Sequence, residues 1–340
     1  EGRGVLVAIL DTGVEIDHPM LSKTWTGEDK IVDSRDFSGQ GHVELAPTVV
    51  ADDGTLIVPT GGRFSVAGIE GTEFSFGFFP GSTLQYSEDV AAKDTFRAVA
   101  VLSYQTPEGR RARLDLDGDG NFTNDVEIHD FAESRRWVKL GARGTLTAAV
   151  NLAADGTSAS LVFDDGTHGS HVAGITAGYD PEGLVGVAPG AKVLSAKIGD
   201  SRLSGGSTTT ASMLLAIDYA VAKGAQVINL SYGIRAGSNV GASAIDQYID
   251  EVARKAGTIF SISAGNEGPG LLTVGTPAGA SLAITNGAYV SPTTAYENYG
   301  YVGMDKETVW WFSSVGPRLD GGLKPTLLAP GSALSSVPLW

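Results

Sequence analysis

Five short segments of the chain are mostly apolar and show no regular alternation with polar residues. Runs of this length are typical of strands that are buried on both faces of a parallel sheet. They lie at residues 4–10, 192–198, 226–233, 258–263 and 282–288. Segments with apolar residues at helical spacing separate several of them, at residues 168–177, 209–223 and 244–255. This alternation predicts an α/β fold in which helices cover both faces of a parallel sheet.

The alternation stops between residues 34 and 159. Short strand candidates lie there among Gly, Asp and Thr residues, at 64–67, 74–79, 98–103 and 149–153. Residues 146–162 have the pattern of a hairpin that turns at Ala-Asp-Gly. We therefore predict that residues 1–33 and 160–340 form the α/β domain, and that residues 34–159 form an inserted, mostly β subdomain.

Composition excludes several classes of function. The 340 residues carry a net charge of −15, which argues against nucleic acid and anionic membranes as partners. No apolar run approaches the length of about 18 residues that a membrane-spanning helix needs. Cysteine is absent, so thiol catalysis and a disulfide scaffold are both excluded.

Three polar residues follow or begin the predicted elements in a way that suggests catalysis. Asp11 comes at the carboxyl end of the first strand, where functional residues of α/β sheets collect. His168 begins a helix, and an imidazole fixed there can act as a general base near neutral pH. Asn266 lies in a glycine-flanked loop after residues 258–263, where its amide can donate to an oxyanion. Each residue alone also has an ordinary role in a turn or helix cap, so the combination carries the hypothesis.

The segments around these residues resemble the signatures of the subtilisin-like serine proteases and come in that family's order. They are Asp11-Thr-Gly, His168-Gly-Ser-His171-Val-Ala-Gly, Ser263-Ala-Gly-Asn266-Glu-Gly and Phe312-Ser-Ser-Val-Gly-Pro317. The resemblance implies a subtilisin-like three-layer fold and hydrolysis of peptide bonds by an Asp-His-Ser triad. It also implies that Asp11 orients His168, that His168 is the general base, and that Asn266 donates to the oxyanion. His171, Ser313 and Ser314 are expected to be structural.

A closer resemblance is to the tripeptidyl-peptidase II branch of that family, which also has a long insertion between Asp and His. The matching segments are residues 197–204, 229–233, 287–292 and 329–340. Members of that branch hold the free amine of the substrate with two glutamates, but the corresponding places here have Ser207 and Ile234. A desolvated ammonium group without a partner is costly. We therefore predict an endopeptidase, with a tripeptidyl exopeptidase that uses acids of the insertion as the alternative.

The nucleophile that the resemblance implies is not found in these residues. In the family it belongs to a Gly-Thr-Ser-Met-Ala-like segment that follows the motif matched here by Ala329-Pro-Gly331. Ser335 and Ser336 are expected to be strand or loop residues. The sequence thus predicts that the serine lies beyond Trp340 and that residues 1–340 alone do not hydrolyse peptides. A non-catalytic, protease-like domain that binds peptides or assembles with other subunits is the alternative from a different class.

The resemblance also suggests how a peptide or protein substrate binds. Residues Ser231, Tyr232 and Gly233 are expected to form an edge to which an extended peptide adds as a strand. Gly265, Thr273 and Gly275 are expected to line the pocket for the residue before the cut, which would take an apolar or uncharged side chain. A homo-oligomer stays open.

A second candidate site lies in the insertion. Alternate acidic residues and a glycine at the sixth position form a loop that can surround a hard cation with oxygen ligands. The predicted calcium ligands are Asp115, Asp117, Asp119, Asn121 and Asp125. The twelfth position, which is usually acidic, has Val126, so a solvated acidic loop is the alternative. Calcium favours a secreted protein, whereas the branch resemblance implies a cytosolic relative. Location is left open, with secretion favoured.

Overall fold

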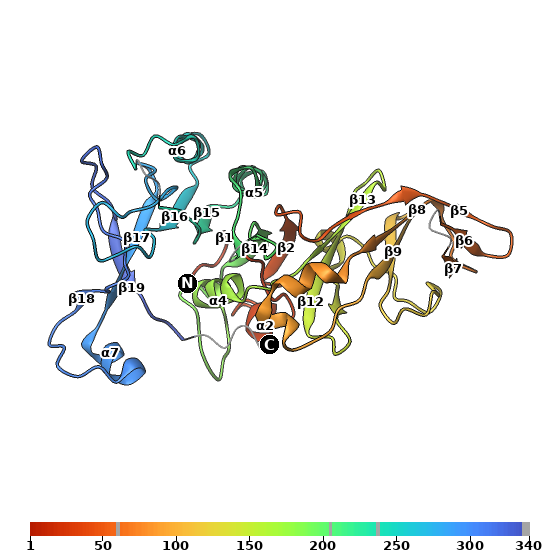
Figure 1. The fold of residues 1–340 in the computed structure, drawn as a ribbon, viewed down its shortest axis with the longest axis horizontal. Coiled ribbons are helices and arrows are strands. Elements are labelled where there is room, and N and C mark those ends of the chain that lie inside the picture. The colour runs from red at the N-terminus through yellow and green to blue at the C-terminus, as the bar shows by residue number, and fades with distance from the viewer. Residues whose placement is uncertain (59–61, 204–205, 236–238, 335–340) are drawn as a thin grey trace.

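The centre of the molecule is a mostly parallel, eight-stranded sheet (Figure 1). The computed structural model describes residues 1–58, 62–203, 206–235 and 239–334. The strand order is β18-β17-β16-β15-β1-β14-β2, with β19 also paired to β17, and β18 is the antiparallel strand. The strands are β1 (Leu6–Asp11), β2 (Ile31–Asp36), β14 (Lys192–Lys197), β15 (Val227–Leu230), β16 (Ile259–Ser263), β17 (Ile284–Val290), β18 (Thr308–Val309) and β19 (Leu327–Pro330).

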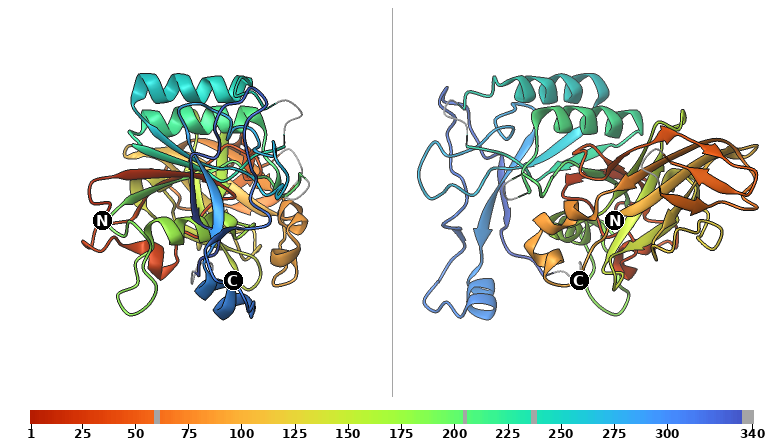
Figure 2. Two further views of the ribbon diagram at one scale, coloured as in Figure 1. Left: turned by 90° about the vertical axis from the view of Figure 1, so that its left-hand side faces the viewer. Right: turned by 45° about the vertical axis from the view of Figure 1, so that its right-hand side comes forward.

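Helices cover both faces of this sheet, with α4 on one face and α5 and α6 on the other (Figures 1 and 2). Strand β1 shows why its sequence is apolar throughout. Val7 and Ile9 pack in one core with Ala173 of α4, whereas Ala8 and Leu10 point to the core that contains α5 and α6. The three-layer subtilisin-like fold predicted from the sequence is confirmed. The helices are α4 (His168–Ala177), α5 (Thr210–Ala222) and α6 (Ala244–Ala256).

Local signals in the sequence set the limits of these helices. Ser243 forms a reciprocal capping box with Asp246 at the start of α6, and Gly257 ends that helix with a φ of +70°. Helix α7 (Pro292–Tyr299) begins with a proline after a Ser291 cap and also ends at a glycine with positive φ. No helix in the described part of the chain is both long enough and apolar enough to cross a membrane.

The insertion is built from antiparallel sheets. Its two four-stranded sheets have the orders β10-β9-β8-β4 and β11-β12-β13-β3, and a smaller sheet has the order β5-β6-β7. The strands are β3 (His42–Glu44), β4 (Ala46–Pro47), β5 (Val49–Val50), β6 (Thr55–Ile57), β7 (Arg63–Ser65), β8 (Thr72–Phe79), β9 (Val99–Thr106), β10 (Gly109–Asp115), β11 (Trp137–Leu140), β12 (Leu146–Leu152) and β13 (Ser158–Val162). Short helical segments complete the chain: α1 (Pro19–Ser22), η1 (Gly81–Tyr86), α2 (Glu88–Ala91) and α3 (Phe131–Ser134).

The insertion packs directly against the central domain. Val150 of β12 lies in the core between the two larger insertion sheets, while the adjacent Ala149 lies in the core that contains β1 and α4. Arg35 of β2 also forms a two-point ion pair with Asp130 of the insertion, at 2.8 and 3.1 Å. Strand β2 runs to Asp36 in the central sheet, and β13 runs to Val162 in an insertion sheet.

Candidate functional site

The candidate residues gather at one edge of the central sheet. Strands β1, β15 and β16 are parallel neighbours, so their carboxyl ends meet there. Asp11 is the last residue of β1, Ser231 follows β15, and Asn266 lies three residues after β16. Two strand spacings, about 10 Å, separate β1 from β16.

The structure brings Asp11 and His168 together. The Nδ1 atom of His168 lies 2.7 Å from Oδ1 of Asp11, which also accepts a hydrogen bond from the Thr12 amide at 2.8 Å. Asp11 is fully buried, whereas about half of the His168 side chain is exposed. The bond to the carboxylate places the ring proton on Nδ1. Nε2 is then the nitrogen that can accept a proton.

Two glycines allow this close approach of helix α4 to the end of β1. A Cβ atom on Gly169 would lie 2.0 Å from the Gly13 carbonyl oxygen and 3.0 Å from the Asp11 Cβ. Gly13 has a φ of +118°, and a Cβ there would lie 2.3 Å from the Phe163 carbonyl oxygen. A side chain at Gly169 would push helix α4 away from the end of β1, and one at Gly13 would push away the segment that leads into the helix.

The environment of His168 favours its protonated form. The hydrogen bond with Asp11 raises the pKa of His168 above its ordinary value, and the charges of Asp11 and Asp164 act in the same direction. Burial opposes this effect without reversing it. A base whose conjugate acid is stabilised in this way is suited to taking a proton during a reaction.

The loop that carries Asn266 is held in place by hydrogen bonds to the buried Ser314. The Ser314 hydroxyl, which is buried, donates to the Glu267 carboxylate at 2.9 Å and accepts from the Glu267 amide at 3.1 Å. Gly265 has a φ of +111°, and a Cβ there would lie 2.5 Å from Glu267 Oε2 and 2.7 Å from Ser314 Oγ. Asn266 itself is exposed and makes no side-chain hydrogen bond within the described residues. Its amide is therefore free to donate to a ligand.

The expected serine braces also lie beneath this loop. The Ser313 hydroxyl accepts from the Ala288 amide at 2.9 Å, and the Gly268 amide donates to the Phe312 carbonyl at 2.9 Å. Ser313 and Ser314 are both 1% exposed. The Ser313 hydroxyl thus binds β17, and the Ser314 hydroxyl binds the loop that carries Asn266.

The expected substrate edge is open for hydrogen bonding. In the described part of the chain, no backbone hydrogen bond uses the amide or carbonyl of Tyr232 or Gly233. The next residue, Ile234, forms a two-bond antiparallel bridge with Thr276. On the other side, the Tyr232 hydroxyl donates to the Gly206 carbonyl at 2.9 Å.

The residues expected around the pocket before the cut have different surroundings. Gly275 donates its amide to the Ala264 carbonyl at 3.0 Å and passes so close to Ile234 that a Cβ would lie 2.7 Å from its carbonyl oxygen. Thr273 is 3% exposed, and its hydroxyl bonds to Gly270 and Val315. Gly275 thus lies beside Ile234, next to the expected substrate edge, while the Thr273 side chain links Gly270 to Val315.

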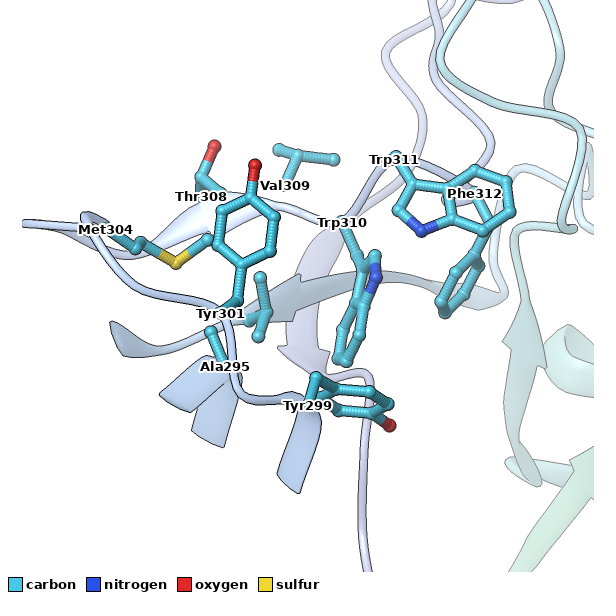
Figure 3. Close-up of a pocket in the computed structure, with 10 residues that line it drawn as sticks. Ala295, Tyr299, Tyr301, Met304, Thr308, Val309, Trp310, Trp311 and Phe312 are labelled. Carbon is cyan, nitrogen blue, oxygen red and sulfur yellow. The ribbon is translucent and has the colours of Figure 1, made fainter. Parts of the chain in front are cut away.

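Sequence reasoning missed an aromatic pocket of about 580 Å³, and Phe312 is one of the residues that line it (Figure 3). Trp310 packs against Tyr299 and Phe312 with ring centroids 5.0 and 5.5 Å apart, and Trp311 is 70% exposed. The density of aromatic residues between positions 296 and 312 was the available signal. Sequence reasoning also missed Asp164, because the Asp-Asp-Gly triplet that begins with this residue is typical of a turn.

The acidic loop of the insertion lies apart from this edge and gathers its carboxylates. One oxygen from each of Asp115, Asp117 and Asp119 lies within 4.8 Å of the others. Burial and these three charges raise the pKa of Asp125 to about 7, and its Oδ2 atom is buried without a hydrogen-bond partner. Asn121 uses its side-chain oxygen to accept from Thr123. Oxygen donors around a site of strong negative potential match the preferences of a hard cation.

Comparisons with known proteins identify the family of the chain. A model described as the Subtilase family matches residues 2–339. All of this chain aligns with 29% of pyrolysin from Pyrococcus furiosus at 31% identity, and with 30% of tripeptidyl-peptidase 2 from Oryza sativa subsp. japonica at 30% identity. A crystal structure of tripeptidyl peptidase 2 superposes over 97% of this chain and 31% of its own, with a TM-score of 0.79 and 25% identity. The chain thus spans about three tenths of the length of these relatives.

Proposed function

The chain belongs to the subtilase family, and from this premise we propose that it supplies the base, the orienting carboxylate and the oxyanion donor of a serine endopeptidase. The observation that carries the proposal is the 2.7 Å contact between Asp11 and His168 at the edge that also presents Asn266. A buried carboxylate, an exposed imidazole and a free amide at one sheet edge are the parts that acyl transfer requires.

In the proposed reaction, a serine from the residues after Trp340 attacks the carbonyl carbon of the scissile bond. His168 Nε2 takes the hydroxyl proton, and the ionised Asp11 stabilises the resulting imidazolium. The carbonyl electron pair moves to oxygen, where the Asn266 amide donates a hydrogen bond to the oxyanion. Collapse of this intermediate breaks the carbon–nitrogen bond, and His168 passes its proton to the leaving amine. Water then hydrolyses the acyl-enzyme by the same route.

The proposed substrate is an internal segment of a peptide or protein. An extended chain can add to the open backbone groups of Tyr232 and Gly233 as an extra strand. By the resemblance to the tripeptidyl-peptidase II branch, Ser207 and Ile234 correspond to its amine-binding glutamates, and Ile234 is 71% exposed. Because neither residue can neutralise an ammonium group, binding of a free amino terminus is not favoured.

Labelling with a fluorophosphonate probe tests the catalytic proposal. We expect a longer chain that continues past Trp340 to be labelled, and residues 1–340 alone to remain unlabelled. His168→Ala should abolish labelling, whereas His42→Ala, at an exposed histidine of the insertion, should leave it unchanged. A longer, folded chain that is not labelled would favour the non-catalytic, peptide-binding alternative.

Two peptide substrates separate the endopeptidase from the tripeptidyl exopeptidase. An internally quenched peptide with a blocked amino terminus should be cleaved, and a tripeptide amide with a free amine should be cleaved poorly. The reverse order of rates would assign the chain to the exopeptidase class.

A structural role for calcium is part of the proposal. Residues Asp115, Asp117, Asp119 and Asp125 would supply carboxylate ligands, with Asn121 at the seventh position of the loop. The gathered carboxylates and the unpaired oxygen of Asp125 support this assignment. Bound calcium would then hold the loop that follows β10.

A further inference from the structure

A buried carboxylate joins the two segments that carry Asp11 and His168. Asp164 is 2% exposed and lies outside the dyad itself. Its Oδ1 accepts from the Thr12 hydroxyl at 2.7 Å and from the Gly166 amide at 3.0 Å. Its Oδ2 accepts from the Ser170 amide at 3.0 Å and from the Ser170 hydroxyl. Each carboxylate oxygen thus receives one backbone N–H and one hydroxyl.

Both hydroxyls also accept a bond, so they extend the link across the two segments. The Thr12 hydroxyl accepts from the Gly169 amide at 2.9 Å, and the Ser170 hydroxyl accepts from the Glu15 amide at 2.8 Å. Thr12 directly follows Asp11, and Gly169 directly follows His168. The cross-links therefore lie immediately beside the Asp11–His168 contact.

The backbone just before His168 is held in an unusual conformation. Thr167 has a φ of +58°, a left-handed value that β-branched residues rarely adopt, and its side chain does not cap helix α4. Asp164 binds the amides on either side of this segment, at Gly166 and Ser170. Surrounding contacts must maintain such a conformation, and clusters of this kind occur at functional sites.

We propose that Asp164 is a positioning residue that sets the distance and angle between Asp11 and His168 through the hydroxyls of Thr12 and Ser170. Its importance for catalysis rests on the proposed function, but its effect on the dyad does not. A carboxyl group fits this place because two backbone N–H groups and two hydroxyls donate to it, whereas an amide would turn an NH₂ group toward one of the two backbone N–H donors.

Other charged groups surround the dyad and must be considered in any titration. Lys197 of β14 is buried and donates to the Thr12 carbonyl at 2.7 Å and to Asp165 Oδ1 at 3.1 Å. Burial raises the pKa of Tyr232, after β15, and the charge of Asp11 raises it further. Variants that change Asp164 itself alter the charge near His168. The decisive variant therefore leaves every charge in place.

Thr12→Val is that variant, because valine keeps the shape of threonine and removes the linking hydroxyl. NMR titration of residues 1–340 measures the pKa of His168 and the low-field signal of its Nδ1 proton without any need for catalysis. We expect Thr12→Val to lower the pKa of His168 by about 0.5 to 1 unit and to weaken the low-field signal. Thr12→Ser, which restores the hydroxyl, should titrate like the unaltered chain. Ser170→Ala should have a smaller effect in the same direction as Thr12→Val.

The outcomes separate this inference from the proposed function. A folded Thr12→Val chain with unchanged His168 titration and an unchanged low-field proton would overturn the positioning role, even in a chain that fluorophosphonate labels. A shifted titration in a chain that is never labelled would support the positioning role and refute the peptidase. If Asp164→Asn does not fold, the Thr12 and Ser170 variants still decide the question.

Discussion

Replacement of Gly265 by alanine tests whether the Asn266 loop has the rigidity that the structure describes. The φ of +111° at Gly265 lies outside the conformations that alanine adopts readily, and left-handed backbone costs about 1–2 kcal/mol for such residues. The new Cβ would also meet Glu267 Oε2 at 2.5 Å and Ser314 Oγ at 2.7 Å. Exposed Glu267 can swing aside, but its bond with buried Ser314 is then lost, at about 1 kcal/mol.

Gly300→Ala is the matched control. Gly300 also has positive φ, at +65°, but a Cβ there meets nothing within 4 Å. Both substitutions reduce the entropy of the unfolded chain equally, so this effect cancels in the comparison. We expect Gly265→Ala to lower the free energy of unfolding by about 2–3 kcal/mol and Gly300→Ala by about 1 kcal/mol.

Urea denaturation followed by circular dichroism measures the two free energies of unfolding. The rate of fluorophosphonate labelling in the longer chain measures the function of the loop. Because the substitution displaces the Asn266 amide, we expect labelling to slow by about 10²-fold, the usual effect of losing one oxyanion donor. Equal stability of the two variants together with an unchanged labelling rate would refute the described role of the loop.

Three further predictions concern pH, calcium and the substrate amine. Because the pKa of His168 is raised, the rate of labelling should increase with pH through a midpoint above about 6.5. Asp11→Asn should lower this midpoint. A midpoint that does not move would contradict the coupling between Asp11 and His168. The raised pKa of His168 also stabilises the fold. This stabilisation is complete below the pKa of His168 in the unfolded chain and is lost as pH rises through its pKa in the folded chain. Urea titrations at several pH values can measure it. Because the pKa of Asp125 is raised to about 7, the calcium-free fold should lose stability from about pH 4 to pH 7. Calcium should therefore raise the melting temperature more at about pH 8 than at about pH 5.5. Asp125→Asn should reduce this gain, whereas the control Asp155→Asn should not. If calcium raises the melting temperature at neither pH, the proposed calcium site is wrong. Finally, Ser207→Glu with Ile234→Glu should increase cleavage of free-amine tripeptide amides relative to blocked peptides, and an unchanged ratio would show that these positions do not contact the amino terminus.

Strands and helices that pack in the cores on the two faces of the central sheet could be predicted from the sequence with good accuracy. Residues 168–177 were predicted as a helix and form α4, and the apolar run at residues 4–10 corresponds to β1. Strand β2 was not predicted, because its Asp33, Arg35 and Asp36 interrupt the apolar pattern. These polar groups are accommodated by ion pairs and turn contacts with the insertion and α5, which the sequence of the strand does not reveal.

The candidate site could be predicted only where its residues belong to recognisable motifs. Asp11 and His168 were paired by resemblance, and the structure places them 2.7 Å apart. Asp164 could not be found in the same way, because its importance comes from four donors supplied by separate segments. The aromatic pocket depends on the approach of α7 to β18, and periodicity carries no information about that contact.

The insertion leaves and rejoins the central domain through neighbouring strands, because β3 pairs with β13 and the Leu161 amide donates to the Gly41 carbonyl at 2.9 Å. The cost of closing a loop grows slowly with its length, so exposed turns of the segment beyond this stem can be lengthened at little cost in closure entropy. The insertion also contacts the segment before His168, through the bond from Gln40 to Asp165 at 2.7 Å. Longer turns at the far end of the insertion can therefore be accommodated without changing the strands that carry Asp11 and lead to His168.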